Sequence, residues 1–294
     1  MDILEPDQIS QEHWVKMNSV LSSPFEFQFM VNAFVISSII SIPTSLFSCY
    51  LVLKGWALLG DAISHAVLPG IVLAYIFGFP LLFGAFCAGI FCAFATEFLS
   101  QNTRVKEDTV MGVVFSGMFG LGIFIYSKTE PEIHLDHILF GNILGVSERD
   151  IVITGCLTTV VTGLLLLKRS DFLLNSFDPI QAKTSGLNTS FLNYGLLIML
   201  ALIIVSMLSS VGIILSIGLL IAPGAIAFLI TNQFKKMLVV AMIITVVVSF
   251  TGVYLSFFLD SAPAPTIILV LSAVFILVFV SSKIKYSVFV KSMK

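Results

Sequence analysis

Apolar stretches long enough to cross a membrane recur along the whole chain, and they limit the fold more than any other feature. A helix needs about 20 apolar residues to cross the hydrocarbon core of a bilayer. The 294-residue sequence offers about nine such stretches, approximately 27–53, 56–77, 81–99, 109–127, 151–167, 191–215, 217–231, 237–259 and 266–282. Only 11% of the residues are charged, far fewer than in a soluble domain. We therefore predict an all-α, polytopic integral membrane protein with nine transmembrane helices. The weak boundary near residue 216 leaves eight as the alternative.

The distribution of lysine and arginine predicts the orientation. If Lys54 is cytoplasmic, alternate connections carry most of the remaining basic residues, and the opposite side collects the acidic ones. Cytoplasmic loops are enriched in basic residues, so we expect the N-terminus outside and the C-terminus inside. One integral domain covers residues 27–285, with an extracytoplasmic N-terminal extension (1–26) to which we assign no role and a cytoplasmic tail (286–294). The extension is acidic and polar and does not predict a cleavable signal peptide.

The second apolar stretch carries two ionisable side chains, Asp61 and His65, four residues apart. On a helix this spacing places both on one face. A carboxylate and an imidazole at membrane depth require partners, a cavity or a cation. Pro69 and Gly70 follow directly, and they predict a broken or kinked helix. We interpret the pair as a cation site on a transport path. The alternative is a polar pair with a structural role only.

A second proline–glycine pair, Pro223–Gly224, predicts a similar helix break in the seventh stretch. Glu97 lies near the cytoplasmic end of the third stretch, and we expect it to pair with Arg104 or to reach the membrane interface. The acidic connection 128–150 contains His134 and His137, which are a weak metal signal without a helical pattern.

The long cytoplasmic connection predicts a short helix near residues 178–186. Asp178 is suited to the N-cap and Pro179 to the first helical position, and Gly186 is suited to the C-terminal end. Such a helix is a stiff element for receiving a push from a soluble partner, or else an ordinary surface helix.

Recognisable catalytic patterns are absent from the sequence. There is no GxxxxGK[ST] phosphate-binding loop, no HExxH, no CxxC and no nucleophile elbow. The sequence therefore predicts neither an enzyme nor a permanently bound cofactor, and the lack of a basic patch argues against nucleic acid as a partner.

Three segments resemble one known family: LVLKGWALLGDAISHAVLPGIVLAY, FDPIQAKTSGL and SIGLLIAPGAIAFLI. They are similar to the membrane subunits of bacterial ABC importers for divalent metals, the permease family that serves manganese, zinc and iron uptake. The resemblance covers about residues 27–285, and its wording is closer to the manganese and iron members than to the zinc members. It implies a type II ABC importer-like fold in the bacterial inner membrane.

The resemblance also implies partners and site residues. A second permease copy or a related permease would complete the pathway, and an extracytoplasmic metal-binding protein would deliver the ion. Two cytoplasmic ATP-binding subunits would dock on the 178–186 helix, where we expect Asp178, Pro179, Ala182 and Gly186 to take part. Asp61 and His65 would handle manganese, iron or zinc as the transported substrate. Pro69, Gly70, Pro223 and Gly224 would be helix breaks in the pathway.

Spacing alone leaves two rival functions open. One is an ATP-independent cation channel or secondary transporter that uses Asp61 and His65 as an ion or proton relay. The other is a membrane scaffold or receptor component that transports nothing.

Overall fold

The computed structural model describes residues 22–56, 58–129, 141 and 143–292, and these residues form helices and no strand. The elements are η1 (Ser23–Glu26), α2 (Gln28–Lys54), α3 (Leu59–Ala66), α4 (Leu68–Phe77), α5 (Leu81–Asn102), α6 (Glu107–Thr129), η2 (Ile143–Gly145), α8 (Glu148–Leu167), α9 (Arg169–Phe177), α10 (Pro179–Thr184), α11 (Thr189–Ile230), α12 (Phe234–Phe258) and α13 (Pro263–Ser292). Within this part of the chain, nine helical segments are long and apolar enough to cross a membrane. The predicted all-α class and the span count are confirmed.

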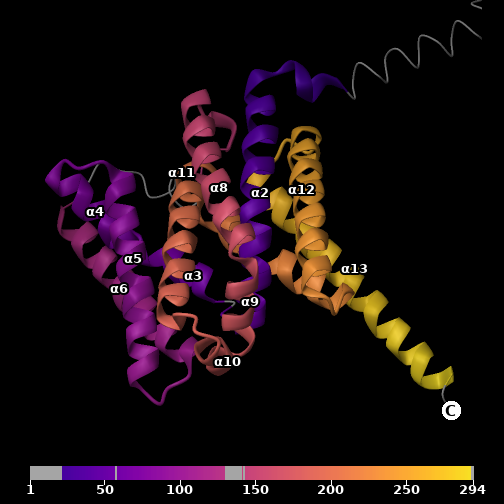
Figure 1. Ribbon diagram of the computed structural model, residues 1–294. Coiled ribbons are helices and arrows are strands. Elements are labelled where there is room, and N and C mark those ends of the chain that lie inside the picture. Colours follow the sequence, from indigo (N-terminus) through magenta and orange to yellow (C-terminus); the bar gives the residue numbers. More distant parts are fainter. Residues whose placement is uncertain (1–21, 57, 130–140, 142, 293–294) are drawn as a thin grey trace, which may run out of the picture.

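The helices form three adjacent groups (Figure 1). Helices α4, α5 and α6 lie on one side, α2, α8 and α11 in the middle, and α12 and α13 on the other side. Short helices α9 and α10 lie at the end of the molecule where α5 connects to α6. Helix α2 and the first part of α11 are the most buried of the spans, so the two form the centre of the fold.

Small polar side chains join the central helix α2 to its neighbours. The hydroxyl groups of Ser41 on α2 and Ser249 on α12 share a hydrogen bond of 2.7 Å. Ser48 accepts a hydrogen bond from the backbone N–H of Gly224 at 2.8 Å and donates one to the Ile221 carbonyl at 3.0 Å. Lipid tails are as apolar as the helix surface, so no hydrophobic driving force brings membrane helices together. Hydrogen bonds between helices help to hold them in contact instead.

The interruption of α11 lies at Gly212, which has φ 79° and ψ 176°. This backbone conformation favours glycine. Gly212 lies within the candidate span Ser210–Ile230, close to the end of the preceding candidate span Thr189–Leu208. A side chain at Gly141 would collide with the backbone of Val211 and Gly212, so Gly141 packs directly against this break.

The expected break at Pro223–Gly224 is not present, because α11 is helical through both residues. Ser48 of the neighbouring helix α2 bonds backbone groups on both sides of the proline. Contacts of this kind from neighbouring helices help a membrane helix to accommodate a proline. Helix α13 continues as far as Ser292, beyond the predicted span 266–282, and the assignment of residues 286–294 to a cytoplasmic tail stays a prediction.

Candidate functional site

Asp61 and His65 lie together on the short helix α3. The His65 Nε2 atom is 3.3 Å from the Asp61 Oδ1 atom, and the side chains are 24% and 34% exposed, respectively. The pair therefore lies on one face, as its spacing predicts. The opposite side of α3 is fixed against α11, because a Cβ atom at Gly60 would lie only 3.0 Å from Leu220.

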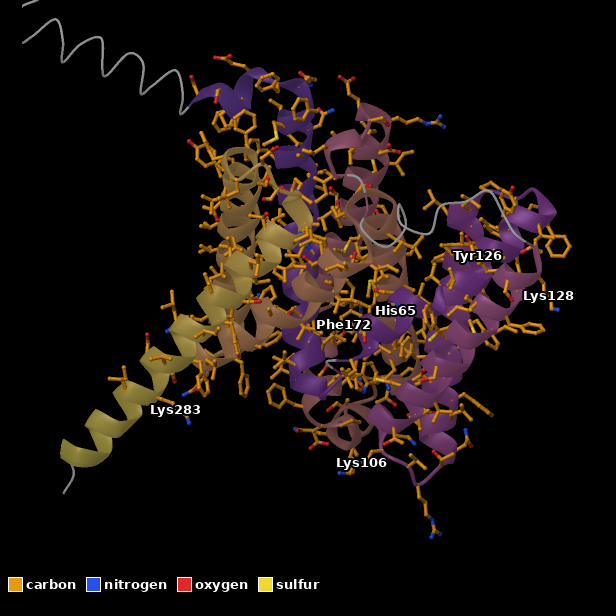
Figure 2. The ribbon with its side chains drawn as sticks, turned by 180° about the vertical axis from the view of Figure 1, so that it is seen from behind. His65, Lys106, Tyr126, Lys128, Phe172 and Lys283 are labelled. Carbon is orange, nitrogen blue, oxygen red and sulfur yellow. The ribbon has the colours of Figure 1, made fainter. Side chains whose placement is uncertain are left out.

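Two aromatic rings of α6 surround the imidazole. The ring centroids of Phe115 and Phe119 each lie 5.4 Å from that of His65. Both phenylalanines belong to the middle of α6, and Figure 2 places His65 between the ends of that helix, which Lys106 and Tyr126 mark. His65 thus lies at membrane depth. The Nε2 atom of the imidazole faces Asp61. The Nδ1 atom is buried and has no hydrogen-bond partner among the described residues.

The separation of these two donor atoms suits a shared cation. Two ligands at about 2.1 Å from one ion lie roughly 3.3 Å apart when the angle between them is close to tetrahedral. A carboxylate oxygen and an imidazole nitrogen together suit manganese, iron or zinc. Among the described residues, no group of three or more His, Cys, Asp or Glu side chains is placed to hold a metal ion. Two protein ligands alone leave an ion open to further ligands.

The helix changes direction directly after this pair. Helix α3 ends at Ala66 and α4 begins at Leu68, so the break precedes Pro69. Gly70 lies at a close approach of α4 and α5, since a Cβ atom there would lie 2.6 Å from Ala88 Cβ and would collide with the carbonyl group of Gly84. The sequence predicted a break here, but it did not predict the backbone contact.

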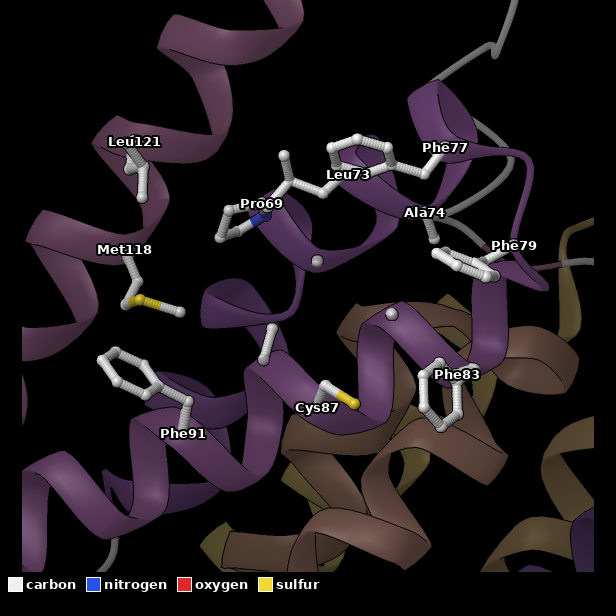
Figure 3. A pocket seen from close by; sticks show the side chains of 13 residues that line it. Pro69, Leu73, Ala74, Phe77, Phe79, Phe83, Cys87, Phe91, Met118 and Leu121 are labelled. Carbon is white, nitrogen blue, oxygen red and sulfur yellow. The ribbon is translucent and has the colours of Figure 1, made fainter.

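A pocket beside this contact is apolar and does not include the ionisable pair (Figure 3). It encloses about 440 Å³ between α4, α5 and α6. Phe77, Phe79, Phe83 and Phe91 supply much of its lining, and no lining residue is charged. It offers a cation no carboxylate or imidazole, only the sulfur atoms of Cys87 and Met118, so it suits manganese or iron less well than the Asp61–His65 pair does.

The predicted short helix is present as α10. The Asp178 carboxylate accepts hydrogen bonds from the backbone N–H groups of Ile180 and Gln181 at 3.0 and 2.9 Å. Pro179 occupies the first turn, and Gly186 has a left-handed φ of 83° directly after the last turn. These local features agree with the expected capping pattern.

Ala182 is the exception, and its expected role at a partner contact needs correction. Its side chain is completely buried against its own chain, so it has no surface for a partner. Exposed apolar side chains do lie on or beside α10, among them Ile180, 78% exposed, and Phe177, 66% exposed. Neither was predicted from the sequence, although two large apolar residues beside a capped helix are a usable signal.

Glu97 also differs from the expectation. It is only 4% exposed and accepts hydrogen bonds from Gln101 and Asn193. Contrary to the prediction, its carboxylate therefore does not extend toward the membrane interface. His134 and His137 lie outside the described residues.

Comparison with known proteins agrees with this architecture. Residues 26–282 match the ABC 3 transport family. The chain belongs to this family. It is 50% identical over 265 residues to a probable iron transport system membrane protein of Haemophilus influenzae, covering 90% of this chain and 98% of that protein.

Two further relatives agree with this assignment. The chain is 39% identical over 279 residues to the manganese transport system membrane protein MntB of Synechocystis, covering 94% of this chain and 88% of that protein. The solved structure of PsaBC from Streptococcus pneumoniae superposes with a TM-score of 0.79 at 32% identity, covering 90% of this chain and 95% of that one.

Proposed function

We propose that this chain is the membrane permease subunit of an ATP-driven importer of divalent transition metal ions, with manganese or iron as the substrate. The observation that carries the proposal is the Asp61–His65 pair, 3.3 Å apart at membrane depth, in a member of the ABC 3 transport family. The chain itself is not an enzyme, and ATP is hydrolysed by separate subunits.

The substrate ion binds transiently between Asp61 and His65. Asp61 supplies charge and an oxygen ligand, and His65 supplies its Nε2 nitrogen. Incomplete coordination favours transport, because an ion that is held too tightly does not leave. A second permease copy or a related permease faces the exposed edge of the pair and supplies further ligands.

The end of the molecule that carries α10 faces the cytoplasm in this proposal. Basic residues belong to the elements and connections at this end: Lys54 ends α2, Arg104 and Lys106 lie between α5 and α6, Lys168 and Arg169 lie where α8 meets α9, and Lys183 belongs to α10. Cytoplasmic ends of membrane proteins are enriched in such residues. The two ATP-binding subunits dock around α10, with Ile180 and Phe177 as apolar contacts, and an extracytoplasmic metal-binding protein delivers the ion at the opposite face of the bacterial inner membrane.

The test is metal uptake by proteoliposomes that contain the permease with its ATP-binding subunits. Manganese, ferrous iron and zinc are each supplied with and without ATP. Asp61→Asn and His65→Ala should abolish uptake while the complex still assembles. Glu148→Gln, which removes an exposed carboxylate at the start of α8, is the matched control and should transport like the parent.

Two results contradict the proposal. Uptake that persists in both site variants would remove this pair from the pathway. Uptake by the parent without ATP would instead indicate a channel or secondary transporter.

A further inference from the structure

A buried carboxylate outside the Asp61–His65 pair lies near the end of α5. Glu97 is 4% exposed. Its Oε1 atom accepts two hydrogen bonds, from Gln101 Nε2 at 2.6 Å and from Asn193 Nδ2 at 2.9 Å. Burial of a carboxylate is unfavourable without such partners. A side chain kept in this position therefore needs a reason beyond packing.

Asn193, near the start of α11, is the centre of a wider hydrogen-bond network. Its Nδ2 atom donates to Glu97, while its Oδ1 atom accepts from Lys54 Nζ and from Asn175 Nδ2, both at 2.7 Å. One amide thus connects a carboxylate, an ammonium group and a second amide. The four residues belong to α2, α5, α9 and α11, so the network joins four helices at a single point.

Two members of the network flank α10 in the chain. Asn175 lies on α9 shortly before α10, and Asn193 lies on α11 shortly after it. Both ends of the segment that holds α10 are therefore attached to the same hydrogen-bonded centre.

The other two members lie next to the start of α3. Lys54 is the last residue of α2, and its ammonium group lies 3.9 Å from the ring centroid of Trp56 in the connection to α3. Leu59, the first residue of α3, borders a narrow enclosed gap together with Trp56 and Glu97. Asp61 follows two residues later. The network thus lies between the α10 segment and the helix that carries the ionisable pair.

We propose that Asn193 and Glu97 are positioning residues that transmit a displacement of the α10 segment to α3. This inference rests on the proposed function, because it assumes that ATP-binding subunits move α10. Hydrogen-bond networks between rigid helices can carry coupling between distant sites, and these partly buried bonds join four helices directly. The competing explanation is that the network only stabilises the fold.

The experiment measures metal ions imported per ATP hydrolysed, with the complete transporter in proteoliposomes and manganese as the ion. Asn193→Leu removes the centre of the network, and Asn175→Leu removes the bond to α9. Both should lower this ratio by roughly 2- to 30-fold, the range found for substitutions in coupling networks. The amount of assembled complex and its unfolding temperature are recorded in parallel, because a structural role alone changes those values and not the ratio.

Two matched variants test the assignment. Glu97→Gln keeps an oxygen that can accept both hydrogen bonds and should stay within about twofold of the parent, below the effects expected in coupling networks. Gln101→Ala removes a bond to Glu97 but no link to α9 or α11, and its ratio should match the parent. If Asn193→Leu does not assemble, Asn175→Leu decides, because it also removes a buried carbonyl oxygen that has no partner among the described residues.

Three results overturn the inference: an unchanged ratio in assembled Asn175→Leu and Asn193→Leu, an equal fall in Gln101→Ala, or a Glu97→Gln ratio as low as that of Asn193→Leu. A parent transporter that shows no ATP-driven uptake would instead contradict the proposed function itself, so the two failures are distinguishable.

Discussion

Replacing Gly70 by alanine tests how the break after His65 is held in place. The added Cβ atom would lie 2.6 Å from Ala88 Cβ and 2.8 Å from the carbonyl carbon of Gly84, whereas ordinary contact begins at 3.4 Å. Helices α4 and α5 must therefore separate by at least about 0.8 Å, and overpacking of this kind costs about 1–3 kcal/mol. Each kcal/mol lowers the unfolding temperature of a protein of this size by about 2–4 °C.

The same displacement should reduce transport, because α4 directly follows the helix that carries the Asp61–His65 pair. We expect metal uptake to fall by about tenfold or more, since a misplacement near 1 Å at a reacting or binding group has effects of that order. Gly84→Ala should have the same effect from the other side of the contact. The double variant should lose less stability and less transport than the sum of the two single effects, because both substitutions disturb the same contact.

The controls are Gly120→Ala on α6 and Gly163→Ala on α8, where an added Cβ atom meets nothing within 4 Å. Thermal unfolding in detergent and uptake in proteoliposomes compare all variants. If Gly70→Ala and Gly84→Ala unfold and transport like these controls, the close backbone approach is not the constraint that we describe.

Two further predictions follow from other contacts. Ser48→Ala removes the hydroxyl group that bonds backbone groups of α11 beside Pro223. It should destabilise the protein by about 1–3 kcal/mol, measured by thermal unfolding. The control is Ser45→Ala, whose hydroxyl group bonds only within its own helix and whose loss should have a smaller effect. Asp178→Ala removes the N-cap of α10, which is worth about 1 kcal/mol. It should weaken binding of the ATP-binding subunits about fivefold in a binding titration, whereas Asp178→Asn keeps a capping side chain and should bind like the parent. Equal binding by the two variants would contradict this prediction.

Local sequence rules predicted the parts of this protein that depend on neighbouring residues. The hydropathy of each stretch predicted the spans, because transfer into lipid depends on about 20 consecutive side chains. Helical periodicity placed Asp61 and His65 on one face, and a capping residue followed by proline predicted α10. Each of these features is decided within a few turns of helix.

Contacts between distant residues required the tertiary structure. Glu97 binds Asn193, 96 positions away, and no local pattern predicts that partner over the nearby Arg104. The sequence predicts a helix break at Gly70, but the close contact of Gly70 with Gly84 depends on how α4 and α5 cross. The hydrogen bonds from Ser48 to α11 beside Pro223 likewise come from another helix. The sequence by itself thus determined the membrane-spanning class, the ionisable pair, the capped helix and the break after His65. Only the packing of helices against one another decided which polar groups are satisfied and which helices touch, because those contacts join residues far apart in the chain.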